Sequence, residues 1–390
     1  MSATDVTFVL PEEERYSAAG GAIATVTREL VTALQRQGAS TSVISPRSHS
    51  PIPYAAARVD WLSRTGDLSV ARRTWYAVSA RVRRAHSPWR SRYLREVEQV
   101  LTDTNPDAVV VANDPQLAGL LARHHSGRTV VLWLHNYLVG APARALRDLP
   151  ATVRIVAVSD AVRRWTAEQH ELDPARISVI HNGVDTTRFH PGPSERAPGP
   201  MRVVCHGRID PNKGFLVAAE AVAALRAAGR TDISLTIIGG RRTFGYDESA
   251  VDDYMRALED AVGRARGTFT GWIPAQDVPE ALRAFDVACV LPLVPDPFLM
   301  AGLEAMASGC AVVAVPLGGV AEWVGDAAII VEPDAMSVAH ALEALATDQD
   351  MLDAAKEAAT AQAARFTWDV AAGALTALLR HDPGTIVEPT

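Results

Sequence analysis

The sequence has few cysteines and no long apolar run, and each of these absences excludes a class of protein. Three of its 390 residues are cysteines, and Cys205, Cys289 and Cys310 each lie in an apolar run, with no pair at zinc-ligand spacing. We therefore expect core residues in a reducing compartment, and neither a disulfide scaffold nor a zinc site. No apolar segment reaches the roughly 18 residues that span a membrane, and the start lacks the pattern of a signal peptide. These absences predict a cytoplasmic protein.

The net charge of −7 argues against a general nucleic-acid-binding protein, which would carry a surplus of basic residues. The charge is unevenly distributed. Residues 1–195 contain 23 basic and 19 acidic residues, whereas residues 196–390 contain 15 basic and 26 acidic ones. This asymmetry indicates two domains with different partners.

Short Val- and Ile-rich runs alternate with helical patterns along the whole chain, and their nearly continuous apolar character is typical of parallel strands covered by helices on both faces. A Pro- and Gly-rich segment, residues 191–200, separates two such series. The expected fold class is α/β, with two Rossmann-like, doubly wound domains, residues 1–195 and 196–365, and a C-terminal helix within 366–390. The expected strands cover residues 6–10, 41–45, 107–113, 129–135, 154–159, 177–182, 202–208, 234–240, 286–293, 310–316 and 327–332.

Glycines and cations follow two of these strands. Gly20 and Gly21 precede a helical pattern, where backbone N–H groups can approach an anion, although taken alone the pair favours a plain turn. The segment CHGRIDPNKG places Arg208 and Lys213 on either side of a tight turn, and Lys213 is one of only two lysines in the chain. Two cations beside a helix N-terminus suit a diphosphate. A salt-bridged loop is the alternative.

Two acidic residues flank the start of a third helical pattern. Asp296 lies in the loop before it, and Glu304 lies two turns into a helix that begins near Phe298. Both carboxylates can then face one pocket, where they would accept hydrogen bonds from the hydroxyls of a sugar or nucleotide. The alternative is that they are ordinary charges near a helix start.

These motifs resemble those of the retaining glycosyltransferases of family 4, which have the two-domain GT-B fold. The stretches that match are GGAIATVTRELVTAL, AVSDAVRRW, ISVIHNGVDTTRFHP, HGRIDPNKG, FTGWIPAQDVPEAL and GGVAEWVGD, together with the Asp296/Glu304 segment. The resemblance implies two domains that face each other across a cleft, an N-terminal domain on the acceptor side, a C-terminal domain that binds the donor nucleotide, and a last helix that crosses back to the N-terminal domain.

The resemblance also implies roles for individual residues. Arg208 and Lys213 look like the pair that grips the donor diphosphate, Asp296 like a contact to the donor sugar, and His135 like a histidine that faces this sugar. Glu304 corresponds to a residue that holds the ribose. The residues expected to bind the donor nucleotide are Gly20, Gly21, Gly207, Gly239, Ile273, Phe298, Leu299, Met300 and Glu304, with Trp272 beside Ile273 in a base-binding loop.

Two departures from the family pattern affect the donor-sugar end. The first acid is Asp296 where the family has Glu, and Leu299 stands where the family often has Gly. These changes put the identity of the sugar in doubt and, to a lesser degree, the activity.

The expected function is a metal-independent, retaining hexosyltransferase that uses a nucleoside diphosphate sugar, with UDP favoured, and needs no cofactor. The one D-x-D spacing considered, Asp348 to Asp350, lies in a helical linker and is not expected to bind metal. A sugar phosphorylase would need a pyridoxal lysine, and Lys356 lies in a surface-like helix. A sugar-nucleotide-binding pseudoenzyme and a sugar-nucleotide 2-epimerase remain as alternatives.

The acceptor side is less defined. Asn113 and Asp114 end an apolar strand, where acceptor contacts are plausible. The stretch 72–95 contains eight arginines with interleaved aromatic residues, which suits an anionic acceptor or peripheral contact with an anionic membrane, or forms a solvated helical face. A small molecule, a glycan or a lipid-linked group can be the acceptor, and no nucleic-acid partner is expected.

Overall fold

The computed structural model describes residues 4–17, 21–47, 58–62, 88–125, 127–140, 144–192, 199–241 and 248–380, and among residues 88–91 only the backbone. The chain divides into two compact units. Unit 1 comprises Met1–His181 and Trp368–Thr390, and unit 2 comprises Asn182–Thr367. The sequence analysis placed the first domain boundary between residues 195 and 196, whereas the contacts divide the chain 14 residues earlier, before the Pro- and Gly-rich segment.

Unit 1 is built on a parallel sheet with strand order β3-β2-β1-β4-β5-β6-β7. Its strands are β1 (Asp5–Val9), β2 (Ser40–Pro46), β3 (Arg58–Leu62), β4 (Ala108–Ala112), β5 (Thr129–Leu134), β6 (Arg154–Ala157) and β7 (Ile177–Val179). Its helices are α1 (Ala22–Arg36), α3 (Pro88–Thr104), α4 (Pro115–His124), α6 (Asp160–His170) and α14 (Trp368–Arg380). All residues of β4 are buried, as its unbroken apolar run predicts for a strand in the middle of a parallel sheet.

Unit 2 has a second parallel sheet, with order β10-β9-β8-β11-β12-β13. Its strands are β8 (Met201–His206), β9 (Ile233–Ile238), β10 (Thr268–Gly271), β11 (Val287–Val290), β12 (Ala311–Ala314) and β13 (Ile329–Ile330). Its helices are α7 (Phe215–Ala227), α8 (Glu248–Ala265), α9 (Val278–Leu282), α10 (Met300–Ala307), α11 (Val320–Val324), α12 (Ala335–Thr347) and α13 (Gln349–Ala363). The expected fold class, two Rossmann-like α/β domains, is confirmed.

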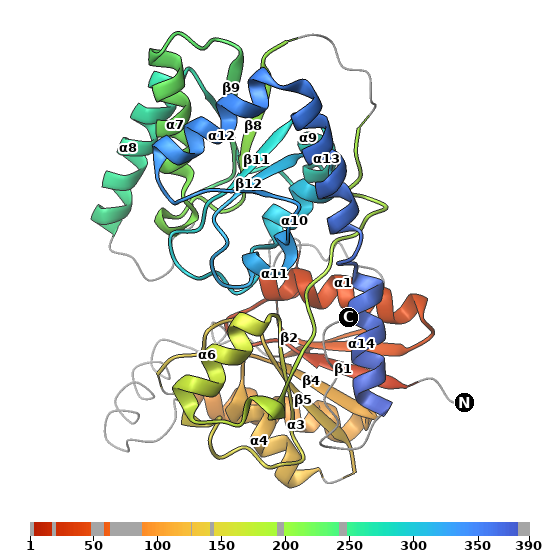
Figure 1. Ribbon diagram of the computed structural model, residues 1–390. Coiled ribbons are helices and arrows are strands. Elements are labelled where there is room, and N and C mark those ends of the chain that lie inside the picture. The colour runs from red at the N-terminus through yellow and green to blue at the C-terminus, as the bar shows by residue number, and fades with distance from the viewer. Residues whose placement is uncertain are drawn as a thin grey trace. The chain divides into compact units, whose positions relative to one another are not determined.

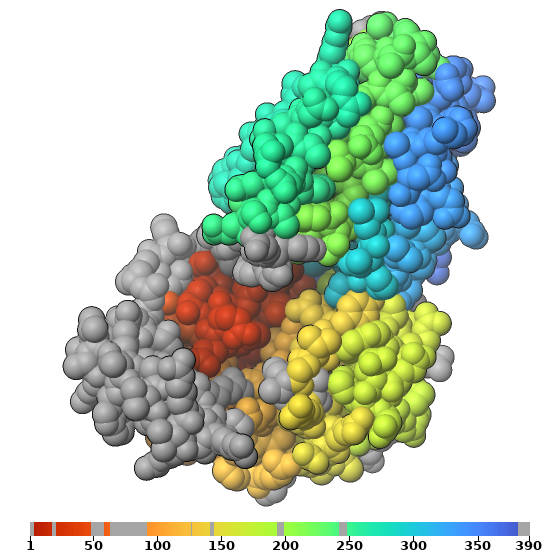
Figure 2. Space-filling model, turned by 90° about the vertical axis from the view of Figure 1, so that its left-hand side faces the viewer, coloured from red at the N-terminus to blue at the C-terminus, as the bar shows by residue number. Residues whose placement is uncertain are grey.

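The core of unit 2 follows the alternation of its strands. Val203 and Cys205 of β8 and Val287 and Cys289 of β11 join α7, α8 and α12 in one apolar cluster. The residues between them, such as Val204, are buried as well, so helices cover both faces of the sheet (Figure 1). Helix α8 lies at the surface of this unit (Figure 2), as its alternation of buried and exposed residues requires.

In both sheets the strand order reverses beside the first strand, between β1 and β4 in unit 1 and between β8 and β11 in unit 2. Open parallel sheets bind ligands at the carboxyl ends of their strands near such a reversal. The topology therefore directs attention to the loops that follow β1, β4 and β5, and to those that follow β8, β9, β10 and β11.

The last helix belongs to unit 1. Helix α14 packs beside α1 (Figure 1), and Trp368, Ala371, Ala372, Leu375 and Leu378 are its buried residues. At its start, Arg36 Nη2 of α1 lies 2.8 Å from Asp369 Oδ1, and the Gln37 side chain donates to the Asp369 carbonyl. The apolar stripe of α14 supplies most of the docking energy, because an exposed ion pair contributes little.

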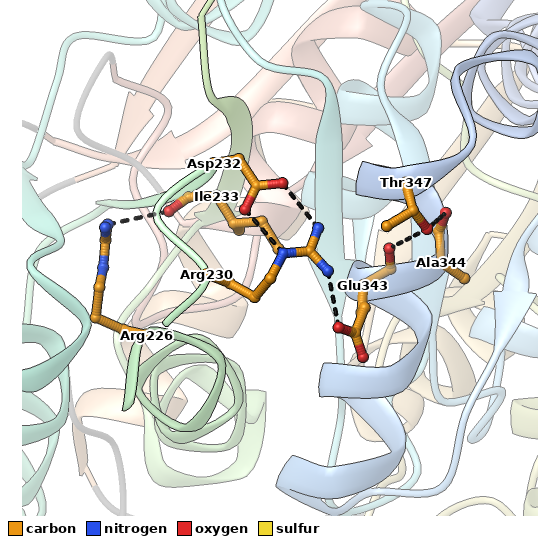
Figure 3. A network of polar contacts seen from close by, with 7 residues as sticks. All are labelled: Arg226, Arg230, Asp232, Ile233, Glu343, Ala344 and Thr347. Carbon is orange, nitrogen blue, oxygen red and sulfur yellow. Dashed lines mark hydrogen bonds and ion pairs between the residues drawn. The ribbon is translucent and has the colours of Figure 1, made fainter. Parts of the chain in front are cut away.

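In unit 2, a group of hydrogen bonds and ion pairs likewise joins a turn to a helix (Figure 3). Arg230, in the turn between α7 and β9, bonds Asp232 and, at 2.7 Å from Nη1 to Oε1, Glu343 of α12. The hydrogen bonds from Arg230 hold the pKa of Asp232 below its usual value. The arrangement fixes the turn after α7 to α12.

Candidate functional site

The loop after β8 carries both cations that the sequence analysis singled out, and each lies beside its own carboxylate. Arg208 Nη2 lies 3.3 Å from Asp210 Oδ2, and Lys213 Nζ lies 2.5 Å from Asp296 Oδ2. Asp210 is buried and accepts a hydrogen bond from the Asn212 amide, which starts a short 3-10 turn over Pro211–Lys213. Asp210 was not expected from the sequence, although an Asp before Pro is a common turn signal.

Asp296 is held on three sides. Its Oδ2 atom contacts Lys213, its Oδ1 atom accepts from the Phe298 amide at 3.0 Å, and its carbonyl accepts from the Gly319 amide. The side chains of Lys213 and Asp296 are each only 16% exposed. The pair therefore joins the loop after β8 to the segment that leads into α10, at the carboxyl end of the sheet.

Two glycines allow this close packing of loops. Gly214 has φ of +69°, and a Cβ atom there would lie 2.0 Å from the Leu291 carbonyl oxygen. Gly239 has φ of +159°, and its Cβ would lie 1.8 Å from the Gly207 carbonyl oxygen. No side chain fits at either position, so the backbone itself forms the contacts between these strand ends.

Helix α10 begins two residues later than the sequence suggested, at Met300, and Leu299 is its N-cap. Leu299 has φ of +54°, in the left-handed region that favours glycine. The departure from Gly noted in the sequence thus lies at a position where the backbone itself prefers Gly. Phe298 is buried, and its carbonyl accepts a hydrogen bond from Trp323 Nε1 at 2.5 Å.

Glu304 lies in the second turn of α10, next to a histidine that the sequence analysis did not include. His206 Nδ1 is 3.9 Å from Glu304 Oε2, and the two side chains are 11% and 20% exposed. Burial lowers the pKa of His206 to about 4, against a smaller raising effect of a hydrogen bond with the Ala301 backbone. A polar residue that ends an apolar strand was the available signal.

The expected base-binding loop follows the edge strand β10. Trp272 is 66% exposed, and its Cβ atom lies 3.2 Å from the point where Gly240 would carry a Cβ. Ile273 follows it and is half-buried. The Gly239 amide donates to the Gly271 carbonyl, which joins this loop to the end of β9.

In unit 1, His135 follows β5 and is fixed by its neighbour β4. The Asn113 side chain, on a residue with φ of +51°, accepts from the His135 amide at 2.7 Å. The imidazole stacks on Trp133 with 5.7 Å between ring centres, and burial lowers its pKa to about 3. The imidazole is therefore neutral at neutral pH.

Gly21 is the N-cap of α1, and its amide donates to Glu14 Oε2 at 3.1 Å. A carboxylate of the chain itself thus lies where the sequence analysis expected an anion to bind. Gly20 lies outside the described residues.

Most of the arginine-rich stretch 72–95 also lies outside the described residues. Where the structure describes it, Tyr93 is buried in unit 1 and donates to the Leu10 carbonyl, and Arg92 pairs with Glu96 of the same helix. Within the described part of the chain, no helix has both the length and the apolar character needed to cross a membrane. Asp348 is the N-cap of α13 and accepts from the Met351 amide.

Comparison with known proteins matches the two halves of the chain to two models. Residues 19–188 match the model described as Glycosyltransferase Family 4, and residues 200–348 match that described as Glycosyl transferases group 1. The chain is 31% identical over 242 residues to a D-inositol 3-phosphate glycosyltransferase from Mycobacterium avium, covering 58% of the chain and 54% of the relative. A D-inositol 3-phosphate glycosyltransferase 2 from Catenulispora acidiphila is 30% identical over 285 residues, 66% of each chain. The chain thus spans about half the length of the first of these relatives.

Solved structures agree in fold over nearly the whole chain. HepE from Anabaena, in complex with UDP and glucose, has a TM-score of 0.72 at 18% identity, and covers 96% of this chain and 99% of that one. Sucrose-phosphate synthase from Thermosynechococcus elongatus has a TM-score of 0.75 at 15% identity, and covers 97% and 98%. The GT-B fold class expected from the sequence is confirmed.

Proposed function

Because the chain belongs to the glycosyltransferases of family 4, we propose that it transfers a hexose from a nucleoside diphosphate sugar, UDP-linked, to a hydroxyl of an acceptor with retention at the anomeric carbon. The observation that carries the proposal is the contact between Lys213 and Asp296 at the carboxyl end of the unit 2 sheet. A cation beside a carboxylate suits a diphosphate with a sugar attached, since the phosphate oxygens need the cation and the sugar hydroxyls need an acceptor.

The two cations can stabilise the negative charge that develops during the reaction. When the bond between the anomeric carbon and the diphosphate breaks, negative charge builds on the diphosphate. Lys213 and Arg208 follow the same strand, and each is now beside a carboxylate that an incoming diphosphate would compete with. The amide end of α10, whose N-cap Leu299 makes no side-chain cap hydrogen bond, adds further partial positive charge.

The bond changes balance without an added metal. The electron pair of the anomeric C–O bond goes to the diphosphate oxygen, the acceptor oxygen forms the new C–O bond on the same face, and the acceptor proton goes to the leaving diphosphate. The two cations and the helix N-terminus perform the charge stabilisation that a divalent ion would otherwise supply. We therefore propose metal-independent transfer with no cofactor.

The remaining residues orient the donor. We propose that Asp296 accepts from the donor-sugar hydroxyls, that Glu304 accepts from the ribose, and that the nucleobase lies against Trp272 and Ile273. In unit 1 His135, held as a neutral imidazole by its burial, is proposed to bond the sugar through a ring nitrogen.

The donor and acceptor proposals draw on the names of the related proteins. HepE has been solved with UDP and with UDP-glucose, which supports a uridine donor. The curated relatives are named for D-inositol 3-phosphate, which makes this small polyol phosphate the first acceptor to test.

Thermal unfolding with UDP, GDP and ADP tests the donor site. A preferred ligand at 100 times its dissociation constant adds about 2.7 kcal/mol of stability. We expect Lys213→Met to lose most of this shift. Lys356→Met, which changes the only other lysine, should keep it, because Lys356 lies on α13 beside Asp286. An equal shift in all three proteins would refute the site.

Turnover distinguishes the enzyme from its alternatives. We expect UDP release from UDP-glucose to depend on D-inositol 3-phosphate and to continue in EDTA. Donor binding with no turnover of any acceptor would favour a pseudoenzyme, and a changed sugar nucleotide formed without acceptor would favour an epimerase. Activity lost in EDTA and restored by Mn²⁺ would contradict metal independence.

A further inference from the structure

The end of β8 carries a buried imidazole nitrogen without a partner. His206 Nδ1 has no hydrogen-bond partner among the residues that the structure describes, and it is shielded from solvent. Its closest acidic neighbour is Glu304, whose Oε2 atom lies 3.9 Å away. Hydrogen bonds between such atoms end at about 3.2 Å, so the two groups face each other without bonding directly.

The electrostatics exclude a simple ion pair as the reason for this arrangement. Burial lowers the pKa of His206 to about 4, so the imidazole is neutral at neutral pH. A buried nitrogen left unbonded costs free energy, and native proteins usually provide a partner for it. No described residue supplies this partner, and a water molecule or the hydroxyl of a ligand is suited to the role.

The geometry selects the chemistry of that partner. A carboxylate accepts hydrogen bonds, whereas a neutral imidazole nitrogen either accepts or donates, depending on its tautomer. A hydroxyl group can satisfy both, because it donates and accepts. An oxygen about 2.8 Å from each atom fits between groups 3.9 Å apart, and a vicinal diol can place one hydroxyl on each.

We propose that His206 is a specificity-determining residue that reads the ribose of the donor, binding one hydroxyl of the 2′,3′-diol through Nδ1 while Glu304 binds the other. The proposal rests on the proposed function, which places the nucleoside at Glu304. It adds a second residue to ribose recognition, from a different element: Glu304 comes from α10 and His206 from the end of β8.

Isothermal titration with UDP, 2′-deoxy-UDP and 3′-deoxy-UDP tests this assignment, with the guanosine or adenosine series in its place if GDP or ADP binds more tightly. We expect the wild-type protein to prefer UDP over each deoxy form by about fivefold or more, as a lost hydrogen bond implies. His206→Phe should abolish the preference for UDP over one of the two deoxy forms and keep the preference over the other. Glu304→Gln should weaken the preference that His206→Phe keeps, so that each residue is assigned to one hydroxyl.

Two matched variants separate recognition from structure. The amide of His206→Asn reaches the place of Nδ1, and that of His206→Gln reaches the place of Nε2, so the Asn variant should retain the preference and the Gln variant should lose it. A residue with a structural role only would lower the affinities for all three nucleotides in parallel, together with the unfolding temperature. This comparison also decides the question if His206→Phe fails to fold.

The outcomes keep this inference distinct from the proposed function. If the wild type binds UDP but does not distinguish the deoxy forms, the imidazole bonds a water molecule only, and the inference is wrong while the donor site stands. The same holds if His206→Gln and His206→Asn discriminate as the wild type does. If the wild type binds none of UDP, GDP and ADP, the proposed function fails, and this inference fails with it.

Discussion

Lys213 and Asp296 form an ion pair across two loops of unit 2, with 2.5 Å between Nζ and Oδ2 and each side chain only 16% exposed. The lysine ends the short turn after β8, and the aspartate precedes α10. Because the pair is largely shielded from solvent, its charges interact more strongly than those of a surface pair. An anionic ligand that uses Lys213 must therefore share it with Asp296.

Neutralising Asp296 should tighten nucleotide binding. Asp296→Asn keeps an oxygen for the Phe298 amide but removes the charge that competes for Lys213. We expect the affinity for UDP to rise about fivefold to tenfold at low ionic strength, with a smaller gain at high salt. Turnover should fall, because the sugar hydroxyls lose a charged acceptor. Titration at two salt concentrations checks the first part, and an unchanged or weaker affinity would contradict it.

The turn at Gly214 should tolerate no side chain. In Gly214→Ala the new Cβ would meet the Leu291 carbonyl oxygen at 2.0 Å, in addition to the strain of a positive φ. We expect a loss of about 3 kcal/mol or more in unfolding free energy, measured by urea denaturation, together with weakened UDP binding. Gly229→Ala is the control, since it has φ of +92° and open space around it, and should cost about 1 kcal/mol. Equal losses in the two variants would show that the clash is relieved.

The two buried histidines should make the protein less stable in mild acid. The pKa of His135 is lowered to about 3 and that of His206 to about 4, both by burial, whereas an unfolded histidine titrates near 6.5. Below pH 6.5 the unfolded chain therefore binds protons that the folded protein does not. Each residue should remove about 1 kcal/mol of stability between pH 7 and pH 5.5, and the loss should continue until the folded pKa is reached.

Comparison of variants isolates the histidines from the other groups that titrate in acid. His206→Asn should flatten the pH dependence of the unfolding free energy by about 1 kcal/mol across that window, and His135→Asn should do the same. Denaturant unfolding at several pH values provides the measurement. A slope that both variants leave intact would mean that neither imidazole is held neutral.

The docking of α14 should depend on its apolar face. Leu375 is fully buried, so Leu375→Ala should cost about 3 kcal/mol in unfolding free energy. Arg36→Ala should cost under about 1 kcal/mol, because the side chains of Arg36 and Asp369 are 50% and 58% exposed. Guanidinium unfolding of the two variants provides the measurement, and a larger effect for Arg36 than for Leu375 would reverse this account.

The sequence predicted most strands because their apolar runs must be buried whatever surrounds them. It did not predict β10, whose residues Thr268–Gly271 are all exposed, or β3, a short edge strand that begins with Arg58 and contains Asp60. The residues of these two edge strands are mostly exposed or half-buried, so their sequences lack the continuous apolar run that marked the other strands. Strands were also predicted too long, as for residues 177–182, of which only Ile177–Val179 form β7.

In the candidate site, too, the sequence predicted local motifs but not the contacts between segments that are far apart in the chain. The segment around Arg208 and Lys213 was recognisable locally, from its cations and turn residues. The partner of Lys213 was not recognisable, since Lys213 meets Asp296 only because β11 lies next to β8 in the sheet. The position of His206 at the end of an apolar strand was a weak signal in the sequence, but its burial and the nearby Glu304, which make it unusual, could not be read from the sequence.

The position of α14 has a consequence for how the protein is made. This helix covers α1, one of the first elements to be synthesised, but it is separated from the rest of unit 1 by all of Asn182–Thr367. During translation the part of α1 that packs against α14 therefore stays uncovered while the ribosome produces unit 2. The domain that starts first is completed last, and a stalled chain would present that bare surface to chaperones and proteases.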